Sequence, residues 1–188
     1  MKITIRKALP EDAYNYAMCH ISCWQTAYKG IVSDEFLSDM RTKKEQQVEG
    51  YRKVLSEPGD CEYYCVLLEE EMIGFYIINQ SRDESQSFIG EIWAVYLVEE
   101  FRGKGLGKEI LAFAVDELKR VSPKEIFLWV LEDNNRARRF YEKNNFVCDG
   151  TKRETTMWGG PLTLVKYVLG VNSASGKHAN RIRNECGI

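Results

Sequence analysis

The segment FRGKGLGKEILAFAVDEL, residues 101–118, is the most informative part of the sequence for the fold and the site. Three glycines alternate with basic residues over positions 102–108, and an amphipathic helical pattern follows at once. Glycine carries an entropic cost in a helix, so three of them within five residues call for a compensating role. A helix N-terminus presents unpaired N–H groups and partial positive charge, and missing side chains let a bulky anion reach them. The segment therefore predicts a diphosphate site at a strand-to-helix turn.

The spacing of these glycines excludes two common nucleotide motifs. The dinucleotide pattern G-x-G-x-x-G would need its third glycine at Lys108 or Ile110. The Walker A pattern would need a Ser or Thr at Glu109 and a glycine at Arg102. The segment could therefore bind a diphosphate through a motif of another class. The alternative is a glycine-rich turn that binds no ligand.

The flanking sequence alternates between strand and helix patterns. Apolar and polar periodicity predicts strands at 2–8, 63–68, 72–79, 88–97, 125–131, 146–158 and 162–170. Helices are expected from Pro10 to a C-cap at Gly30, from a Thr42/Glu45 capping box to Leu55, at 106–121 and at 135–144. Strand, helix and strand over 88–131 imply a right-handed crossover and therefore a parallel pair. We predict an α/β (α+β) fold with a mixed sheet.

Length and composition restrict the class of protein further. The 188 residues suit one domain, which we place at residues 1–170, with a tail at 171–188. A net charge of −2 argues against a nucleic-acid binder. No apolar run approaches the length of a membrane span, and the N-terminus lacks a secretory pattern, so a cytoplasmic protein is expected.

Six cysteines raise the question of a metal site. Cys19/Cys23 and Cys61/Cys65 each have C-x-x-x-C spacing, whereas structural zinc sites use a tighter first pair. Reduced, partly buried thiols are the favoured interpretation, and no metal is expected.

The motif Arg102-x-x-Gly105-x-Gly107, following a strand, resembles the pyrophosphate loop of the GNAT superfamily of N-acetyltransferases. Residues 20–37, 91–111 and 130–146 resemble consecutive blocks of the same family. The resemblance implies a mixed, mostly antiparallel central sheet with helices on both faces. It also implies that the parallel strands 88–97 and 125–131 splay around a cleft for coenzyme A, with a bulge at Val95–Leu97.

The same resemblance implies acetyl-CoA as co-substrate and assigns the residues that bind it. They are Val95, Tyr96, Leu97, Arg102, Gly103, Lys104, Gly105, Leu106, Gly107, Lys108, Asn134 and Tyr141. Main-chain groups of Val95 and Leu97 would bind the pantetheine arm, and the Leu97 amide would polarise the thioester carbonyl. Asn134 is equally well suited to cap the helix that follows it.

Acetyl transfer to an amine needs a base, a carbonyl polariser and an acid for the departing thiolate. Tyr141 is the candidate acid, and its alternative role is that of a core aromatic residue. Glu91 is the candidate base, since alternation places it on one face with Trp93 and Val95; an exposed strand-start glutamate is the alternative. Some relatives that acetylate protein N-termini carry a second glutamate where this chain has Trp129, which argues against that substrate.

Trp24, Tyr28 and Phe36 match the region where relatives form the acceptor pocket. Aromatic faces suit a cationic amine, but they suit a hydrophobic core equally well, and core is favoured for Trp24.

The resulting prediction is an acyltransferase that moves acetyl from acetyl-CoA to a primary amine by direct attack in a ternary complex. The acceptor is a small molecule or a peptide, without nucleic acid or membrane partners, and a homodimer is possible. One alternative is a CoA-binding module without turnover. Another is an interaction protein whose tail contacts an acidic partner through Lys177, Arg181 and Arg183.

Overall fold

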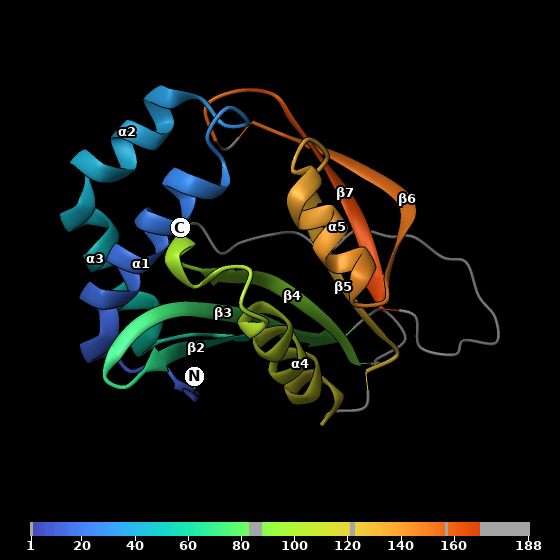
Figure 1. The fold of residues 1–188 in the computed structure, drawn as a ribbon, viewed down its shortest axis with the longest axis horizontal. Coiled ribbons are helices and arrows are strands. Elements are labelled where there is room, and N and C mark those ends of the chain that lie inside the picture. Colours follow the sequence, from blue (N-terminus) through green and yellow to red (C-terminus); the bar gives the residue numbers. More distant parts are fainter. Residues whose placement is uncertain (1, 83–87, 121–122, 157, 170–188) are drawn as a thin grey trace.

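The computed structural model describes residues 2–82, 88–120, 123–156 and 158–169 (Figure 1). The predicted tail at 171–188 lies outside the described residues. Seven described strands form a single sheet in the order β1-β2-β3-β4-β5-β7-β6. Their bounds are β1 Ile3–Lys7, β2 Cys61–Leu68, β3 Glu71–Arg82, β4 Phe88–Leu97, β5 Glu125–Leu131, β6 Phe146–Thr155 and β7 Leu162–Leu169. Only β4 and β5 pair in parallel among them, so the predicted mixed sheet is confirmed.

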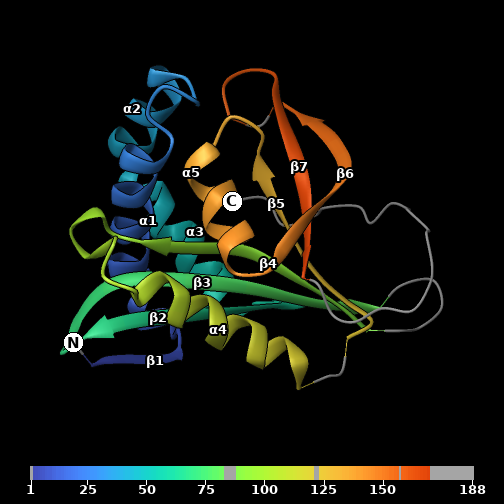
Figure 2. The ribbon, with the colours of Figure 1, turned by 45° about the vertical axis from the view of Figure 1, so that its right-hand side comes forward.

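Five described helices cover both faces of this sheet. They are α1 Ala13–Ala27, α2 Asp34–Thr42, α3 Lys44–Ser56, α4 Leu106–Lys119 and α5 Asn135–Lys143, with short 3₁₀ turns at Pro10–Asp12 and Glu99–Phe101. Helices α1 to α3 lie on one side, and α4 and α5 lie on the other (Figures 1 and 2). The two faces therefore bury separate sets of side chains.

The helix prediction was wrong at residues 33–44. Helix α2 was not predicted, although Ser33 caps it by accepting a hydrogen bond from the Phe36 amide at 3.2 Å. Thr42 does not open the next helix; it ends α2, and its hydroxyl donates to the Asp39 carbonyl at 3.1 Å. Helix α1 ends at Ala27, so Gly30, with φ +77°, belongs to the turn rather than to the C-cap.

Strands β4 and β5 pair over only four residues. The parallel ladder runs from Ile89↔Glu125 to Ile92↔Leu128. Beyond it, β4 continues along β3 to Leu97, and β5 continues along β7 to Leu131. Figure 2 shows β4 lying across the view while β5 rises beside β7. The expected separation of the parallel pair is therefore confirmed.

Three strands carry extra residues, and none matches the predicted bulge at Val95–Leu97. In β3, Val66 opposes Gly74 and Leu67 opposes Met72, so Ile73 is the inserted residue. In β4, Ile77 opposes Ala94 and Ile78 opposes Ile92, so Trp93 is the inserted residue. In β6, four steps from Cys148 to Lys152 correspond to two steps from Tyr167 to Val165 along β7. Gly150, with φ +84°, lies within this irregularity of β6.

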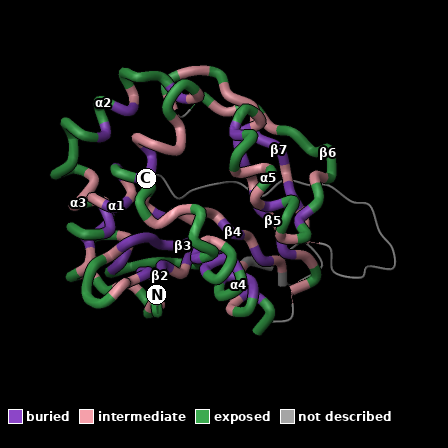
Figure 3. The backbone as a smooth tube through the Cα atoms, in the orientation of Figure 1, coloured by how far each residue is buried: buried purple, intermediate pink, exposed green. Residues whose placement is uncertain are grey.

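The core follows the two faces of the sheet (Figure 3). One large cluster joins α4, α5 and the strands between them, and a second joins α1 and α3 to β2 and β3. The second cluster contains Cys19, Cys23, Cys61 and Cys65, all buried and not joined in disulfides. Within the described residues, no group of three or more His, Cys, Asp and Glu could hold a metal ion. No described helix has the length and apolarity needed to span a membrane.

Candidate active site

The glycine loop leads into α4 with free main-chain donors. Gly103 and Gly105 have φ of +76° and +86°, which favours glycine, and Gly105 is the N-cap of α4. Over the described chain, no backbone hydrogen bond uses the amides of residues 103–107, whereas the Lys108 amide donates to the Gly105 carbonyl at 3.1 Å. Open space surrounds the positions that a β-carbon at Gly103 or Gly105 would take. This arrangement fits a diphosphate seated on unpaired amides.

The other members of the loop segment have different surroundings. A β-carbon on Gly107 would lie 3.4 Å from the Phe140 ring, so this part of α4 lies against α5. The Leu106 side chain is buried in the core. Lys104 and Lys108 are exposed, with the Lys104 ammonium 5.3 Å from the centre of the Phe101 ring. The two lysines are therefore the members of this segment with a charge available to an anion.

The side chain of Arg102 turns away from the loop towards α1. Its Nε donates to the Leu97 carbonyl at 2.7 Å and its Nη2 to the Thr26 hydroxyl at 2.8 Å. Within the described part of the chain, its buried Nη1 has no hydrogen-bond partner. The guanidinium thus joins the end of β4 to the end of α1. The Arg102 main-chain amide donates to the Glu99 carbonyl at 3.0 Å.

The far end of β4 presents main-chain groups on the side where β5 has separated. The Val98 amide donates to the Ile73 carbonyl at 2.9 Å. Because successive residues of a strand point their N–H groups to opposite neighbours, the amides of Val95 and Leu97 are directed away from β3. The backbone of β3 approaches closely here, since a β-carbon on Gly74 would lie 2.5 Å from the Tyr96 carbonyl oxygen.

Two tyrosines from distant parts of the sequence meet beside this strand end, and a third is near enough to interact with them electrostatically. The hydroxyls of Tyr28, at the end of α1, and Tyr96, on β4, are 2.8 Å apart and share a hydrogen bond. Tyr141, on α5, is 9% exposed, and burial and the proximity of Tyr28 raise its pKa. Burial likewise raises the pKa of Tyr96, with further contributions from Tyr28 and Tyr141. Tyr141 therefore stays protonated at neutral pH, as an acid must.

Glu91 lies on β4 where the parallel pairing with β5 is still intact. Burial raises its pKa, while a hydrogen bond with Trp93 and the charges of Arg153 and Lys166 act in the opposite direction. Glu91 and Trp93 lie on the face that carries α1 and α3. Val95 packs into the core beneath α4 instead, because the inserted Trp93 inverts the alternation. The prediction that Glu91, Trp93 and Val95 share one face was therefore wrong for Val95.

Asn134 is the N-cap of α5. Its Oδ1 accepts a hydrogen bond from the Ala137 amide at 3.1 Å, and the residue is 8% exposed. Its Nδ2 has no hydrogen-bond partner among the described residues. The capping role predicted from sequence is thus observed, and the amide nitrogen is left free.

The aromatic residues predicted for the acceptor pocket form one cluster on the α1 and α2 face. Trp24 is 7% exposed and packs in a core cluster with buried residues of α2, β5 and β7. Its ring centre lies 4.5 Å from that of Tyr28 and 5.9 Å from that of Phe36. Tyr28 and Phe36 are only partly buried. Trp24 is accordingly a core residue, and the other two lie closer to the solvent.

Sequence reasoning missed three members of this face. Trp158 lies 5.5 Å from Trp24, ring centre to ring centre. Trp129 faces the same side from β5, and the Arg153 guanidinium of β6 lies 4.5 Å from its ring centre. Sequence reasoning used Trp129 only as the residue at a position where some relatives carry a glutamate. Arg153 carried no signal, because the two inserted residues of β6 hide its register.

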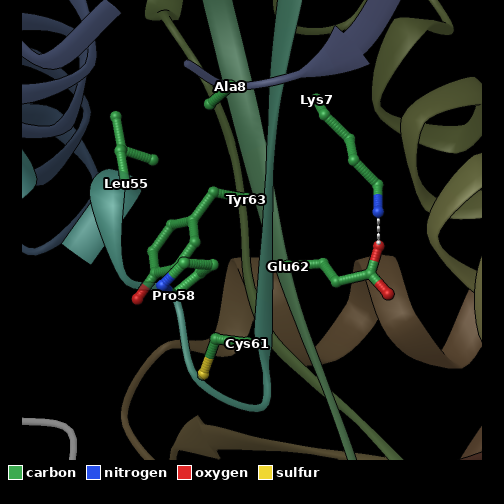
Figure 4. Close-up of a pocket in the computed structure, with 7 residues that line it drawn as sticks. All are labelled: Lys7, Ala8, Leu55, Pro58, Cys61, Glu62 and Tyr63. Atoms are coloured by element: carbon green, nitrogen blue, oxygen red, sulfur yellow. Dashed lines mark ion pairs between the residues drawn. The ribbon is translucent and has the colours of Figure 1, made fainter. Parts of the chain in front are cut away.

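Two pockets lie at the opposite edge of the sheet. The smaller, of about 80 Å³, is lined by Lys7, Ala8, Leu55, Pro58, Cys61, Glu62 and Tyr63 (Figure 4). Lys7 and Glu62 form an ion pair of 2.7 Å beside it, and a wider pocket of about 500 Å³ adjoins these two residues. Neither pocket includes a residue of the predicted site.

Across the described residues, the fold combines a glycine loop with unused amides and a parallel strand pair that is hydrogen-bonded over only four residues. Comparison with protein families identifies the class. The model of the acetyltransferase (GNAT) family matches residues 24–146, more than half of the chain. The chain belongs to the GNAT family and is an N-acetyltransferase that uses acetyl-CoA.

Individual relatives agree with this assignment. The chain is 28% identical to the uncharacterized N-acetyltransferase YuaI of Bacillus subtilis over 182 residues, which covers 89% of this chain and 98% of YuaI. It is 24% identical to the spermidine N(1)-acetyltransferase of Thermoplasma acidophilum, over 80% of this chain and 92% of that protein. The crystal structure of PaiA N-acetyltransferase from Thermoplasma acidophilum in complex with coenzyme A superposes with a TM-score of 0.68 at 26% identity. That superposition covers 88% of this chain and 98% of PaiA.

Proposed function

We propose that the protein transfers the acetyl group of acetyl-CoA to a primary amine by direct attack in a ternary complex. The observation that carries this proposal is the buried Tyr141, near enough to the hydrogen-bonded Tyr28 and Tyr96 to interact with them electrostatically. A protonated phenol there is placed to give its proton to the departing thiolate. The relatives that are named for spermidine acetylation support a small amine as the acceptor.

Main-chain donors supply most of the co-substrate site in this proposal. The amides of residues 103–107 bind the pyrophosphate, and the exposed Lys104 and Lys108 add positive charge. The pantetheine arm lies along β4, where the Val95 and Leu97 amides point away from β3, and the Leu97 amide polarises the thioester carbonyl. The free Nδ2 of Asn134 is a further donor at the start of α5.

Glu91 acts as the base that receives the amine proton. An alkylamine has an ordinary pKa near 10, so the acceptor arrives protonated and must lose a proton before it attacks. Burial raises the pKa of Glu91, which increases the strength of this carboxylate as a base. A bound water would connect it to the amine at the strand end.

Direct attack is favoured because the thiol beside Tyr28 and Tyr96 is inaccessible. Cys23 lies close to Tyr28 and Tyr96 but is 0% exposed. An acyl-enzyme would require a thiolate that the thioester can reach. The attacking amine therefore takes the acetyl group from the thioester itself.

The test is thiol release from acetyl-CoA with a panel of amines, together with calorimetry of CoA binding. The expected result is saturable CoA binding and amine-dependent thiol release. CoA binding without thiol release from any amine would support a sensing module, and the absence of both would overturn the proposal.

A further inference from the structure

The sheet face covered by α1 and α2, which carries the aromatic residues predicted for the acceptor pocket and is called the acceptor face below, also carries a cation. The acetyl transfer described above does not use it. Arg153 lies on β6 opposite Leu164 of β7, which packs with Trp24 and the other residues of the α1 and α2 face. Its guanidinium lies 4.5 Å from the Trp129 ring centre. In the described part of the chain, no hydrogen bond or ion pair engages this guanidinium, although burial lowers its pKa. Five donors are thus held in a sheltered place without an acceptor.

The charged residues near Arg153 differ from it in whether they have an ion-pair partner. Lys166, on the same face, pairs with Glu125 at 2.6 Å and lies 3.8 Å from Asp149. Glu91 is close enough to Arg153 for each to affect the pKa of the other. The Glu91 carboxylate and the Arg153 guanidinium are nevertheless too far apart to form an ion pair, which requires an N–O distance of 4.0 Å or less. Arg153 therefore stacks on Trp129, with the carboxylate of Glu91 close enough to interact with it electrostatically but not paired to it.

We infer that the acceptor is an amine that also carries a carboxylate, with its anion bound by Arg153. This inference rests on the proposed function and names its acceptor class. A guanidinium fork matches a carboxylate in geometry, and its stacking on Trp129 fixes the plane of the fork. Glu91 then lies on the side of the ammonium group. A polyamine would gain from Glu91 but would be repelled by Arg153.

The experiment compares acceptors that differ only in the carboxylate. Thiol release is measured with lysine and with cadaverine, and with ornithine and with putrescine, at equal acetyl-CoA. The expected result is a kcat/KM at least tenfold higher for each amino acid than for its decarboxylated partner, because a charge-assisted hydrogen bond is lost with the carboxylate. An equal or higher kcat/KM for the diamines would overturn the inference.

Variants locate the carboxylate on Arg153. Arg153→Met keeps the apolar stem, and we expect it to lower kcat/KM for the amino acids roughly tenfold or more and to leave the diamines unchanged or improved. The matched control is Lys152→Met on the opposite face of β6, which removes a cation paired with Glu132 at 2.5 Å. CoA binding by calorimetry verifies that each variant is folded. An equal loss for amino acids and diamines would contradict the role of Arg153.

These outcomes separate the two proposals. Thiol release with diamines alone retains the acetyltransferase mechanism and removes the carboxylate inference. Thiol release with no amine removes both.

Discussion

The two sides of the site are built differently. In the proposed site, the co-substrate side uses the main chain of one continuous segment, residues 103–107, at the start of α4. The proposed acceptor side uses side chains such as Tyr28, Glu91, Trp129 and Arg153, which come from four separate parts of the fold. A main-chain site leaves its trace in local spacing, whereas a side-chain site depends on how distant strands are aligned. The difference explains why one substrate follows from the sequence and the other does not.

The largest effect is expected where the two sides meet, at Tyr141. Tyr141→Phe removes the proposed acid, and we expect kcat to fall by roughly 100-fold or more while the Kd for CoA changes much less. Steady-state kinetics and calorimetry measure the two quantities. An unchanged kcat would mean that Tyr141 serves packing alone.

The next effect isolates the co-substrate side. Gly105→Val places a β-branched residue at φ +86°, where its side chain would cover the free amides. We expect CoA to bind about tenfold more weakly or worse, since strain of this kind costs about 1–3 kcal/mol. Gly59→Val is the matched control, because Gly59 has φ +59°, also faces open space, and lies in the turn before β2. Equal CoA affinity in both variants would argue against the amide site.

A smaller effect is expected within the acceptor side, at the tyrosine pair. Tyr28→Phe leaves the Tyr96 hydroxyl without its partner, which costs about 1–2 kcal/mol of unfolding free energy. Adding Tyr96→Phe should cost less than the sum of the two single changes, because both remove the same hydrogen bond. Chemical denaturation measures this, with Tyr14→Phe, at a residue 58% exposed, as the control. Strict additivity would exclude coupling between the hydroxyls.

The smallest effect is on the free energy of unfolding, and its sign should differ between variants of two carboxylates, Glu91 and Glu62. Because burial raises the pKa of Glu91, its contribution to stability is fully present below the ordinary glutamate pKa and is lost as pH rises through the native pKa. Glu91→Gln should therefore slightly raise the free energy of unfolding at pH 7 and leave it unchanged near pH 3.

Glu62→Gln should have the opposite sign. Burial of Glu62 opposes ionisation, but bonds from Lys7 and Tyr64 outweigh it and lower the pKa. The stability gained from Glu62 is present above the ordinary glutamate pKa and lost as pH falls through the native one. Denaturation of both variants at pH 7 and pH 3 measures the contrast, and changes of the same sign would contradict it.

The sequence predicted the fold well because its signals are local. Hydrophobic periodicity located every described strand, and the strand–helix–strand order of 88–131 gave the parallel pair. Helix α2 was missed because its cap, Ser33, comes only three residues after the C-cap expected at Gly30 and was not recognised as a helix start. The Thr42/Glu45 pattern misled because Thr42 bonds backwards to Asp39.

The site was predictable only where a motif or a single strand defined it. The free loop amides and the Asn134 cap agree with the sequence prediction. The direction of the Arg102 side chain and the meeting of Tyr28 with Tyr96 depend on tertiary packing. Arg153 required the register of β6, which no local pattern reveals.

Two of the irregular strands, β4 and β6, differ in how they tolerate insertion and deletion. One extra residue in β4 reverses the side taken by every later side chain, whereas two extra residues in β6 restore the original parity. A change of length by one at Trp93 would exchange the environments of Val95 and Tyr96. The tip around Gly150 can grow or shrink by pairs of residues while Arg153 keeps its side of the sheet, so even-numbered length variation there is compatible with an intact acceptor face.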